Sequence, residues 1–397
     1  MGNHFGRILR VSTFGESHGA AVGVVVDGLP YGLPVDIESI QRELDRRRPG
    51  QNKLTTQRKE ADQVEILSGI FEGKATGTPL AMLVRNADQR SGDYSEMERL
   101  YRPSHADLAY DLKYGFRDHR GGGRSSVRES IGRVAAGALA RQILSAQGCD
   151  ILSWVEAVET IDAVVDPDTV TSEMIEKSLV RCPDPEASSR MEAAIQAARG
   201  DGDSVGGVVR LYVRNPPAGL GEPVFDRTEA LLGQAMLSIP ACKGFEIGSG
   251  FAGTRLRGSQ HNDPWLPGAD GPRLAKNDSG GVQGGITVGA PISARLAFKP
   301  TATIAKSQDT VDKDGHAATL AARGRHDPCV VGRAVPIVEA MAALVLADLF
   351  LLQRARAGVF PPGSQLKDIC KLVTSGNMPE SVEFGTLGAE RLDDDII

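Results

Sequence analysis

Residues 118–129 constrain the fold of this chain more than any other segment. Three glycines at 121–123 lead directly into a segment whose apolar residues recur at helical spacing as far as Ile143. Ser126 and Glu129 have the spacing of a capping box. A glycine loop that ends at a helix N-terminus presents backbone N–H groups and partial positive charge. The segment therefore predicts an anion-binding site, with a capped helix and a solvated basic rim as the alternative.

Positive charge is concentrated in two segments of an otherwise acidic chain. The 397 residues carry a formal net charge of −6. Residues 42–59 contain seven basic and two acidic residues, and residues 113–133 contain six basic and two acidic residues. This distribution favours a concave site for a small polyanion over a general nucleic-acid surface. Aromatic residues make up only 5% of the chain, which also argues against a nucleic-acid partner. A nucleotide- or RNA-binding module that uses the two basic segments is the alternative.

The cysteines and the N-terminus predict a cytoplasmic protein. The five cysteines are odd in number, lie far apart and form no C-x-x-C pair, which is typical of reduced thiols. The N-terminus has no apolar signal-peptide region. The most apolar run, residues 335–352, contains Glu339 and Asp348, so we expect a buried or subunit-facing helix and no membrane partner.

The apolar periodicity predicts an α+β fold without a regular βαβ rhythm. It indicates strands at 20–27, 64–67, 80–84 and 208–213, two strand segments within 286–298, and helices at 36–48, 226–237 and 335–355. Asp36 and Asp226 stand at the N-cap positions of the helices at 36–48 and 226–237. Long irregular segments of this kind, here 244–289 and 299–333, are usually functional in a compact domain. We expect one catalytic domain at 1–360 and a C-terminal tail at 361–397.

Two motifs suggest other chemistries. Residues 248–253 read G-x-G-x-x-G, but the following sequence does not open a helix, so a dinucleotide site is not expected. The seven histidines lack metal-ligand spacing, and we expect no metal.

Ser17 beside His18 suggests a hydrolase, although adjacent residues rarely form a nucleophile–base pair. A hydrogen-bonded loop histidine and a general acid are the other interpretations of His18.

Six motifs taken together resemble the chorismate synthase family over about residues 1–355. They are Gly-Glu-Ser-His-Gly at 15–19, Val-Val-Val-Asp-Gly-Leu-Pro at 24–30, Asp-Arg-Arg-Arg-Pro-Gly at 45–50, Gly-Gly-Gly-Arg-Ser-Ser at 121–126, Pro-Ala-Gly-Leu-Gly-Glu-Pro-Val-Phe-Asp at 217–226 and Arg-His-Asp-Pro-Cys at 325–329. The resemblance implies a large single-domain β-α-β sandwich with long irregular active-site loops, assembled as a homotetramer. It also implies a lyase of the shikimate pathway, in aromatic amino acid biosynthesis. Such an enzyme removes phosphate from 5-enolpyruvylshikimate 3-phosphate by trans-1,4 elimination, and it requires reduced FMN without net redox change.

The resemblance also assigns roles to individual residues. His18 would protonate the departing phosphate, His105 would manage a proton at the flavin, and Asp327 would assist removal of the ring proton. FMN contacts are carried over to Arg124, Ser125, Ser126, Pro240, Ala241, Gly284, Lys299, Pro300, Thr301, Ala302, Thr303 and Arg325. Contacts with a substrate or nucleotide phosphate are carried over to Arg47, Lys53, Arg102 and Arg128.

Four of these positions depart from the family pattern. Lys53 stands where arginine is usual, which keeps the charge but loses the bidentate fork. Pro240 replaces an asparagine, Ser104 replaces a glycine, and Ala302 replaces a serine. None of these changes removes a proposed catalytic group. The chain also has no recognisable flavin-reductase segment, so we expect an external source of reduced FMN and not reduction by NADPH within the chain.

Overall fold

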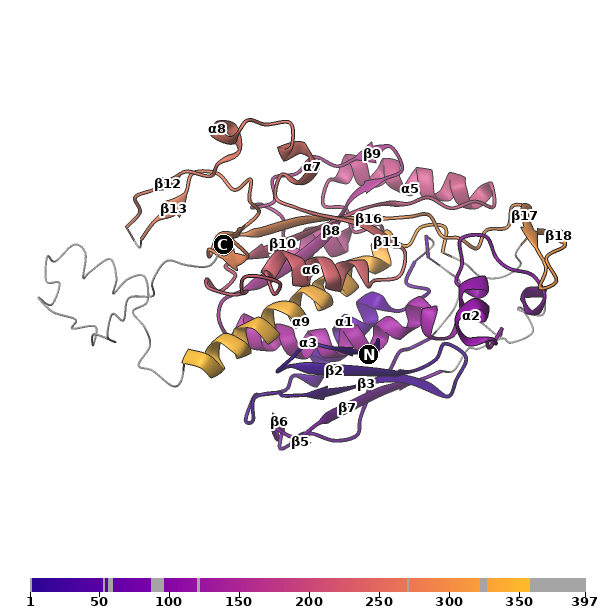
Figure 1. The fold of residues 1–397 in the computed structure, drawn as a ribbon, viewed down its shortest axis with the longest axis horizontal. Helices are drawn as coiled ribbons and strands as arrows, with labels where there is room; N and C mark the ends of the chain where they lie inside the picture. Colours follow the sequence, from indigo (N-terminus) through magenta and orange to yellow (C-terminus); the bar gives the residue numbers. More distant parts are fainter. Residues whose placement is uncertain are drawn as a thin grey trace, which may run out of the picture.

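Two antiparallel sheets form the outer layers of the fold, and helices lie between them (Figure 1). The first sheet has the order β1 (His4–Phe5), β2 (Arg10–Gly15), β3 (Ala21–Asp27), β7 (Leu80–Arg85) and β4 (Glu65–Ile66). The second has the order β11 (Cys242–Ile247), β16 (Ile292–Phe298), β10 (Gly207–Arg214), β8 (Asp150–Val158) and β9 (Ile161–Asp162). The predicted α+β sandwich is therefore confirmed.

The structure is a computed structural model that describes most of the chain. The described residues are 2–52, 54–55, 60–86, 96–119, 122–269, 271–321 and 327–357. The predicted tail at 361–397 and two predicted site residues, Lys53 and Arg325, lie outside these ranges.

Three helices carry most of the contacts between the sheets. Helix α3 (Ser130–Ser145) packs on β2, β3 and β7, and α9 (Val331–Ala357) packs on β8 and β10. The two helices also pack on each other, and α1 (Ile37–Arg47) contacts both. A Cβ at Gly137 of α3 would lie 2.4 Å from the Cβ of Ala340 in α9, so this crossing requires glycine. By length and composition residues 331–356 could span a bilayer, but most of this helix is buried inside the fold. The expected core helix is confirmed.

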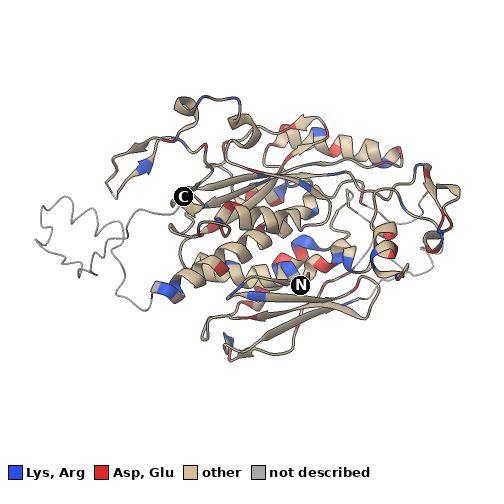
Figure 2. Cartoon of the chain, in the orientation of Figure 1, with Lys and Arg blue, Asp and Glu red and all other residues tan. Residues whose placement is uncertain are grey.

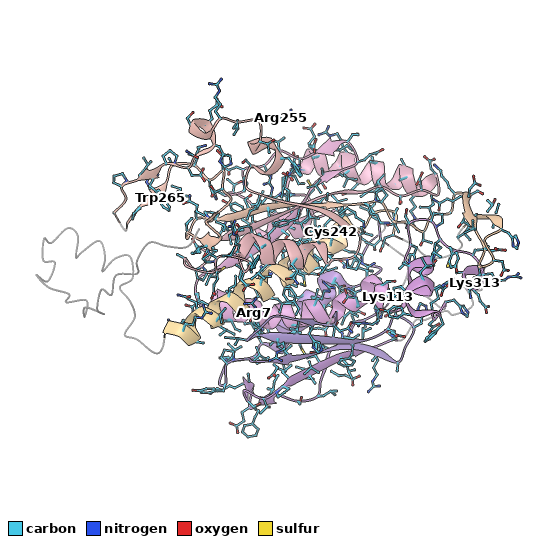
Figure 3. All side chains as sticks on the ribbon, viewed as in Figure 1. Arg7, Lys113, Cys242, Arg255, Trp265 and Lys313 are labelled. Carbon is cyan, nitrogen blue, oxygen red and sulfur yellow. The ribbon has the colours of Figure 1, made fainter. Side chains whose placement is uncertain are left out.

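The remaining described elements lie around this core. The helices are α2 (Asp107–Tyr114), α4 (Ser172–Lys177), α5 (Pro185–Gly200), α6 (Thr228–Leu237), α7 (Gly250–Gly253) and α8 (Gly258–His261). The hairpins are β5–β6 (Ile70–Phe71, Lys74–Ala75), β12–β13 (Trp265–Leu266, Arg273–Leu274), β14–β15 (Val282–Gln283, Ile286–Thr287) and β17–β18 (Gln308–Val311, Ala317–Leu320). Short 3-10 turns are η2 (Glu96–Glu98), η3 (Gly123–Ser125) and η4 (Val127–Glu129). Arg255 and Trp265 mark an arm on the side of the molecule away from Lys113 and α2 (Figure 3).

Most predicted elements are confirmed, and two predicted caps are wrong. Asp36 does cap α1, because its side chain accepts a hydrogen bond from the Ser39 amide. Helix α6, however, begins only at Thr228, and the Asp226 carboxylate binds Arg7 instead. The predicted capping box is also absent: Ser126 accepts from the Arg128 amide, whereas Glu129 pairs with Arg133 one turn later at 2.8 Å. The ion pair between Glu129 and Arg133 therefore uses the carboxylate that the capping box would require.

Residues 248–253 do not form a dinucleotide site. Strand β11 precedes the motif but pairs antiparallel with β16, and only the four-residue helix α7 follows. A dinucleotide site requires a parallel βαβ unit.

Candidate active site

A cavity of about 220 Å³ opens at the end of the sandwich where α1 ends and α9 begins. Loops from both halves of the chain line it. Of the predicted site residues, it brings together His18, Arg47, Arg102, His105, Ser125, Ser126, Arg128, Thr301, Ala302, Thr303 and Asp327. Their separation in the sequence means that only the tertiary fold creates this site.

Arg47 lies in the last turn of α1 and is only 1% exposed. Its guanidinium lies 3.5 Å from Asp62, and its Nε and Nη1 atoms have no hydrogen-bond acceptor among the described residues. Burial lowers the pKa of Arg47 to about 10; Asp62 opposes this shift, whereas Arg333 and Arg128 add to it. A buried cation with unused donors is costly unless an anion completes its shell. Arg47 is therefore suited to bind an anionic ligand.

Arg128 joins Arg47 through shared carboxylates. Its Nη1 donates to Asp62 at 3.0 Å, and its Nη2 forms an ion pair with Glu60. Its Nε also donates to the Asn86 side chain. Arg128 and Asp62 are both buried, so this cluster holds its charges in fixed positions at the cavity wall.

Asp107, the first residue of α2, orients two other site residues. Arg102 donates to both of its carboxylate oxygens at 2.7 Å, and His105 Nδ1 lies 3.0 Å from Oδ1. Burial alone would raise the pKa of Asp107, but the hydrogen bonds from Arg102 and His105 outweigh it and hold the pKa well below its usual range. The carboxylate therefore stays charged and fixes the ring of His105.

Ser17 and His18 lie in the turn between β2 and β3. Ser17 Oγ and His18 Nδ1 are 3.0 Å apart, so His18 is a hydrogen-bonded loop histidine, as one interpretation of the sequence predicted. The turn joins two antiparallel strands and is not a strand-to-helix elbow, which a hydrolase nucleophile of the G-x-S-x-G type requires. With Nδ1 held by Ser17, the ring nitrogen suited to transfer a proton to a ligand is Nε2.

Asp327 and Arg333 form the α9 side of the cavity. Arg333 Nη1 donates to Asp327 at 2.5 Å, and both residues are buried. Arg333 Nε also donates to the backbone oxygen of Arg47 at 3.3 Å. The start of α9 is thereby linked directly to the end of α1.

Hydroxyl groups line the part of the cavity expected to hold flavin. Ser125, Ser126, Thr301 and Thr303 all contribute to its surface. The Thr301 hydroxyl is buried and has no hydrogen-bond partner among the described residues. Such an orphaned donor fits a ligand rich in phosphate or carbonyl oxygens.

Other predicted flavin contacts lie at different places. Arg124 donates to Asn3, to both oxygens of Thr13 and to the Gly15 carbonyl, and it lines a smaller adjoining cavity. Lys299 reaches the rim, where its Nζ donates to the Ser104 carbonyl at 2.8 Å. The Lys299 amide donates to Ala241, which follows Pro240 near the C-terminal end of α6. Pro300 is exposed and does not line the cavity.

Gly284 lies near the opposite, N-terminal end of α6. The carbonyl of the adjacent Gly285 accepts a hydrogen bond from the amide of Thr228, the first residue of that helix. A helix of ten residues separates the two ends by about 15 Å. One chain therefore does not bring Gly284 to the cavity.

Four backbone amides that follow the glycine loop already have acceptors within the turn. The amides of Ser125 and Ser126 donate to Gly122 and Gly123, and those of Arg128 and Glu129 donate to Ser126. These backbone donors are thus used within the turn. The positive character of the cavity comes from arginine side chains.

Sequence reasoning missed Asp62, Asp107 and Arg333. Asp107 had a recognisable signal, since it follows His105 by two residues at the start of a helix. Arg333 follows Asp327 by six residues, and Asp62 carries no local pattern at all. Both acquire their roles only from contacts across the fold.

Among the described residues, the two basic segments do not form a continuous run of exposed cations. Lysines and arginines are interspersed with acidic residues along the described chain (Figure 2). Within residues 42–52, Arg46 and Arg47 are directed into the protein toward acidic partners. Nucleic-acid binding depends on exposed cations that contact phosphates in series. The arrangement therefore argues against the RNA-binding alternative.

Comparisons with known proteins identify the family of this chain. The sequence model of the chorismate synthase family matches residues 9–351. A chorismate synthase from Synechococcus sp. is 58% identical over 360 residues, which cover 90% of this chain and 100% of the relative. One from Opitutus terrae is 60% identical over 361 residues, 91% of this chain and 99% of the relative. A crystal structure of chorismate synthase matches with a TM-score of 0.71 and 34% identity, covering 88% of this chain and 93% of that chain. This chain belongs to the chorismate synthase family.

Proposed function

We propose that this chain catalyses the trans-1,4 elimination of phosphate from 5-enolpyruvylshikimate 3-phosphate to give chorismate. The observation that carries the proposal is the cavity in which His18, His105 and Asp327 face a set of buried arginines. The substrate bears two carboxylates and a phosphate. Arg47, Arg102 and Arg128 supply the charges that such a ligand requires, and guanidinium groups suit both kinds of anion.

The chain's own residues would act on protons at both ends of the elimination. His18, held through Nδ1 by Ser17, would donate a proton from Nε2 to the departing phosphate. Asp327, held by Arg333, would assist removal of the ring proton. His105, oriented by Asp107, would hold a proton beside the cofactor. Burial of the arginines keeps water from competing for the anions.

The cavity suits reduced FMN. When bound, reduced FMN would supply electron density to the substrate ring and recover it, so the reaction would involve no net oxidation. Ser125, Ser126 and the hydroxyls of Thr301 and Thr303 would hold its polar atoms, and Lys299 lies at the rim beside them. Arg124, whose Nη1 and Nη2 bind Gly15 and Thr13 of strand β2, would meet the cofactor from the adjoining cavity that it lines. The reduced cofactor would come from an external source in the cytoplasm.

We also propose the homotetramer that the family resemblance implies. The position of Gly284 supports it, because this predicted flavin contact does not line the cavity of its own chain and a second copy would supply it. Analytical ultracentrifugation of the purified protein tests the assembly, and a monomer would contradict it.

Phosphate release tests the proposed reaction. Purified protein with reduced FMN should release phosphate from the substrate under anaerobic conditions, and omission of FMN should abolish the release. His18→Ala should lower kcat by about 10² to 10⁴-fold, because a positioned general acid is lost. Ser17→Ala removes only the group that holds His18 and should have a milder effect.

The outcomes separate the proposal from the hydrolase alternative. If the folded wild-type protein with bound reduced flavin released no phosphate, the proposed reaction would be wrong. If Ser17→Ala abolished activity as completely as His18→Ala, the serine would be the nucleophile of a hydrolase.

A further inference from the structure

Two helix ends meet at the wall of the cavity. Arg47 lies in the last turn of α1, and Arg333 lies in the first turn of α9. The residues immediately before them, Arg46 and Gly332, are not in the cavity, but their backbone carbonyls face a common partner. That partner is Arg181, which precedes helix α5 and is far from either segment in the sequence.

Helix α9 lacks one backbone hydrogen bond at this place. A helical carbonyl at position 332 normally accepts a hydrogen bond from the amide of residue 336. Residue 336 is proline, which has no N–H. Arg181 Nη1 donates to the Gly332 carbonyl at 2.5 Å and so replaces the missing donor.

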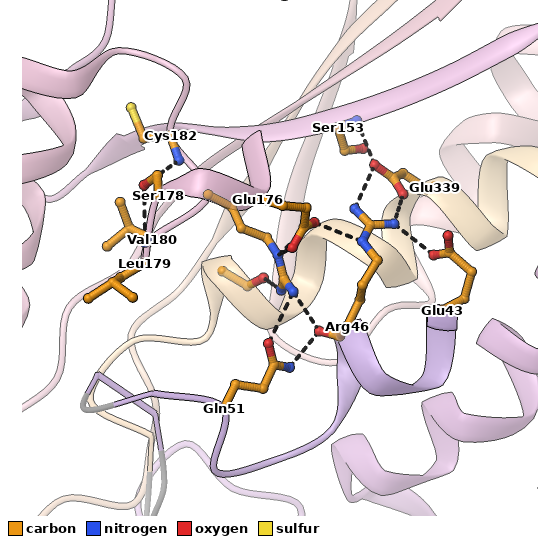
Figure 4. Close-up of polar contacts among 12 residues, drawn as sticks. Glu43, Arg46, Gln51, Ser153, Glu176, Ser178, Leu179, Val180, Cys182 and Glu339 are labelled. Carbon is orange, nitrogen blue, oxygen red and sulfur yellow. Dashed lines mark hydrogen bonds and ion pairs between the residues drawn. The ribbon is translucent and has the colours of Figure 1, made fainter. Parts of the chain in front are cut away.

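The same guanidinium caps the other helix. Arg181 Nη2 donates to the Arg46 carbonyl at 2.9 Å and to the Gln51 side chain at 3.1 Å. Gln51 in turn donates to the carbonyl of Arg46 (Figure 4). It also donates to the carbonyl of Arg48. Carbonyls at a helix C-terminus lack partners within the helix and are stabilised by cationic donors. One side chain therefore satisfies the end of α1 and the start of α9 together.

Arg181 is itself held rigidly. Its Nε donates to both oxygens of Glu176 at 3.1 Å, and Glu176 also accepts from Arg46 at 2.7 Å (Figure 4). The residue is 6% exposed and has a φ of 62°, in the left-handed region that side chains other than glycine rarely adopt. Surrounding contacts must maintain such a conformation.

We propose that Arg181 is a positioning residue that fixes Arg47 and Arg333 relative to each other at the cavity wall. The inference rests on the proposed function in so far as this cavity is the substrate site. Arg181 is not among the residues that line the cavity, so its effect is indirect. By holding the carbonyls that precede them, it sets where Arg47 and Arg333, the partner of Asp327, lie.

A rescue experiment tests this role in the full-length protein. Arg181→Met should weaken the binding of inorganic phosphate about tenfold to 100-fold and raise KM more than it lowers kcat, because misplaced anion contacts lose their alignment. Adding Pro336→Ala restores an amide donor to Gly332 and should recover about threefold of the lost affinity, the effect of roughly one hydrogen bond. Pro336→Ala alone should leave phosphate affinity unchanged. Arg181→Lys should be intermediate.

Arg214→Met is the matched control. Arg214 also donates to three backbone carbonyls, those of Pro167, Asp168 and Val170, but in a loop away from the cavity. Its loss should lower thermal stability and leave phosphate affinity unchanged. If Arg181→Met does not fold, the same comparison is made with Arg181→Lys, with and without Pro336→Ala.

Two results would overturn the proposal. One is wild-type phosphate affinity in the folded Arg181 variant, and the other is the absence of any recovery on adding Pro336→Ala. Hydrogen exchange of residues 44–52 and 327–335, expected to accelerate in Arg181→Met, supplies a readout that needs no turnover. If wild-type protein released no phosphate from the substrate while these effects were present, the proposed reaction would be wrong but the positioning role would stand.

Discussion

Arg46 and Arg47 are neighbours in the last turn of α1, yet they lie in two chemically different regions. Arg46 binds Glu43, Glu176 and Glu339, and the paired carboxylates use its guanidinium donors (Figure 4). Arg47 faces the cavity, where two of its nitrogens have no acceptor among the described residues. Both side chains are cationic and largely withdrawn from solvent, so burial and charge alone do not distinguish them.

The difference appears in the pKa values of the two arginines. Burial opposes the charge of Arg46, but Glu339 and Glu43 outweigh it and raise its pKa well above the usual value. For Arg47 burial wins, and its pKa falls to about 10. A buried arginine whose donors are satisfied stabilises the fold, whereas one with unused donors is held ready for a ligand. Whether the guanidinium donors of an arginine have acceptors in the protein therefore distinguishes the structural region from the candidate active site.

The largest effect on the free energy of unfolding should come from a substitution that removes an ion pair of the structural region. Glu339 accepts from Arg46, from Arg141 at 3.2 Å and from the Ser153 amide at 3.0 Å. Glu339→Gln removes the buried carboxylate that Arg46 and Arg141 share, and we expect it to lower the free energy of unfolding by about 3–5 kcal/mol. Urea unfolding measures this change. Glu38→Gln, which removes an exposed partner of Arg42 on the same helix, should change stability by less than about 1 kcal/mol.

The Glu339 effect should also depend on pH. Burial would raise the pKa of Glu339, but Arg46 and Arg141 lower it below its usual value of 4.5. A depressed carboxyl pKa stabilises the fold above the unfolded-state value, and this stability is lost as the pH falls through the folded-state value. The gap between wild type and Glu339→Gln should narrow at acid pH. A gap that stayed constant down to acid unfolding would contradict the ionic explanation.

A substitution in the cavity region should lower phosphate affinity and leave stability almost unchanged. Arg47→Met replaces a poorly satisfied buried cation by an apolar side chain of similar length, so the free energy of unfolding should stay constant or rise by about 1 kcal/mol. Phosphate affinity should fall about tenfold to 100-fold, because a buried charge contact is lost. Calorimetric titration and urea unfolding of the same sample check both expectations. Strong destabilisation with unchanged affinity would place Arg47 in the structural region instead.

Local sequence patterns could predict the helix that carries both arginines but not their separate roles. Asp36 and the spacing of Ile37, Ile40 and Leu44 define α1, and the structure confirms it. The run of arginines at 46–48 indicated only positive charge. The carboxylate that distinguishes Arg46 from Arg47 lies in α9, almost 300 residues away, as Glu339. A periodic pattern in the sequence cannot predict a contact between residues so far apart in the chain.

The same limit applies to the candidate site. The motifs around His18, His105 and Asp327 were recognisable, and the fold brings all three to one cavity. The residues that orient them were not all predicted, because Asp107 and Arg333 act through side-chain geometry. The contacts of Arg124 show the same limit: its guanidinium binds Gly15 and Thr13 of strand β2, which its place in the glycine motif does not predict, and its flavin contact stays a prediction. Motifs thus identify reactive groups better than they identify the groups that hold them.

The smallest predicted effect is a pH dependence that isolates Arg47. Because its folded-state pKa is about 10, it loses its proton there in the empty protein, and phosphate affinity should fall up to about tenfold per pH unit above that value. The stability of the empty protein should have the opposite slope: the folded state releases the proton at lower pH than the unfolded chain, so deprotonation favours folding. Burial and the nearby Lys243 also lower the pKa of Lys299, so part of the loss of affinity has a second source. Calorimetry between about pH 8 and 11 on wild type and Arg47→Met separates the two, since the variant retains only the Lys299 part. Identical pH profiles for the two proteins would mean that Arg47 does not meet the anion.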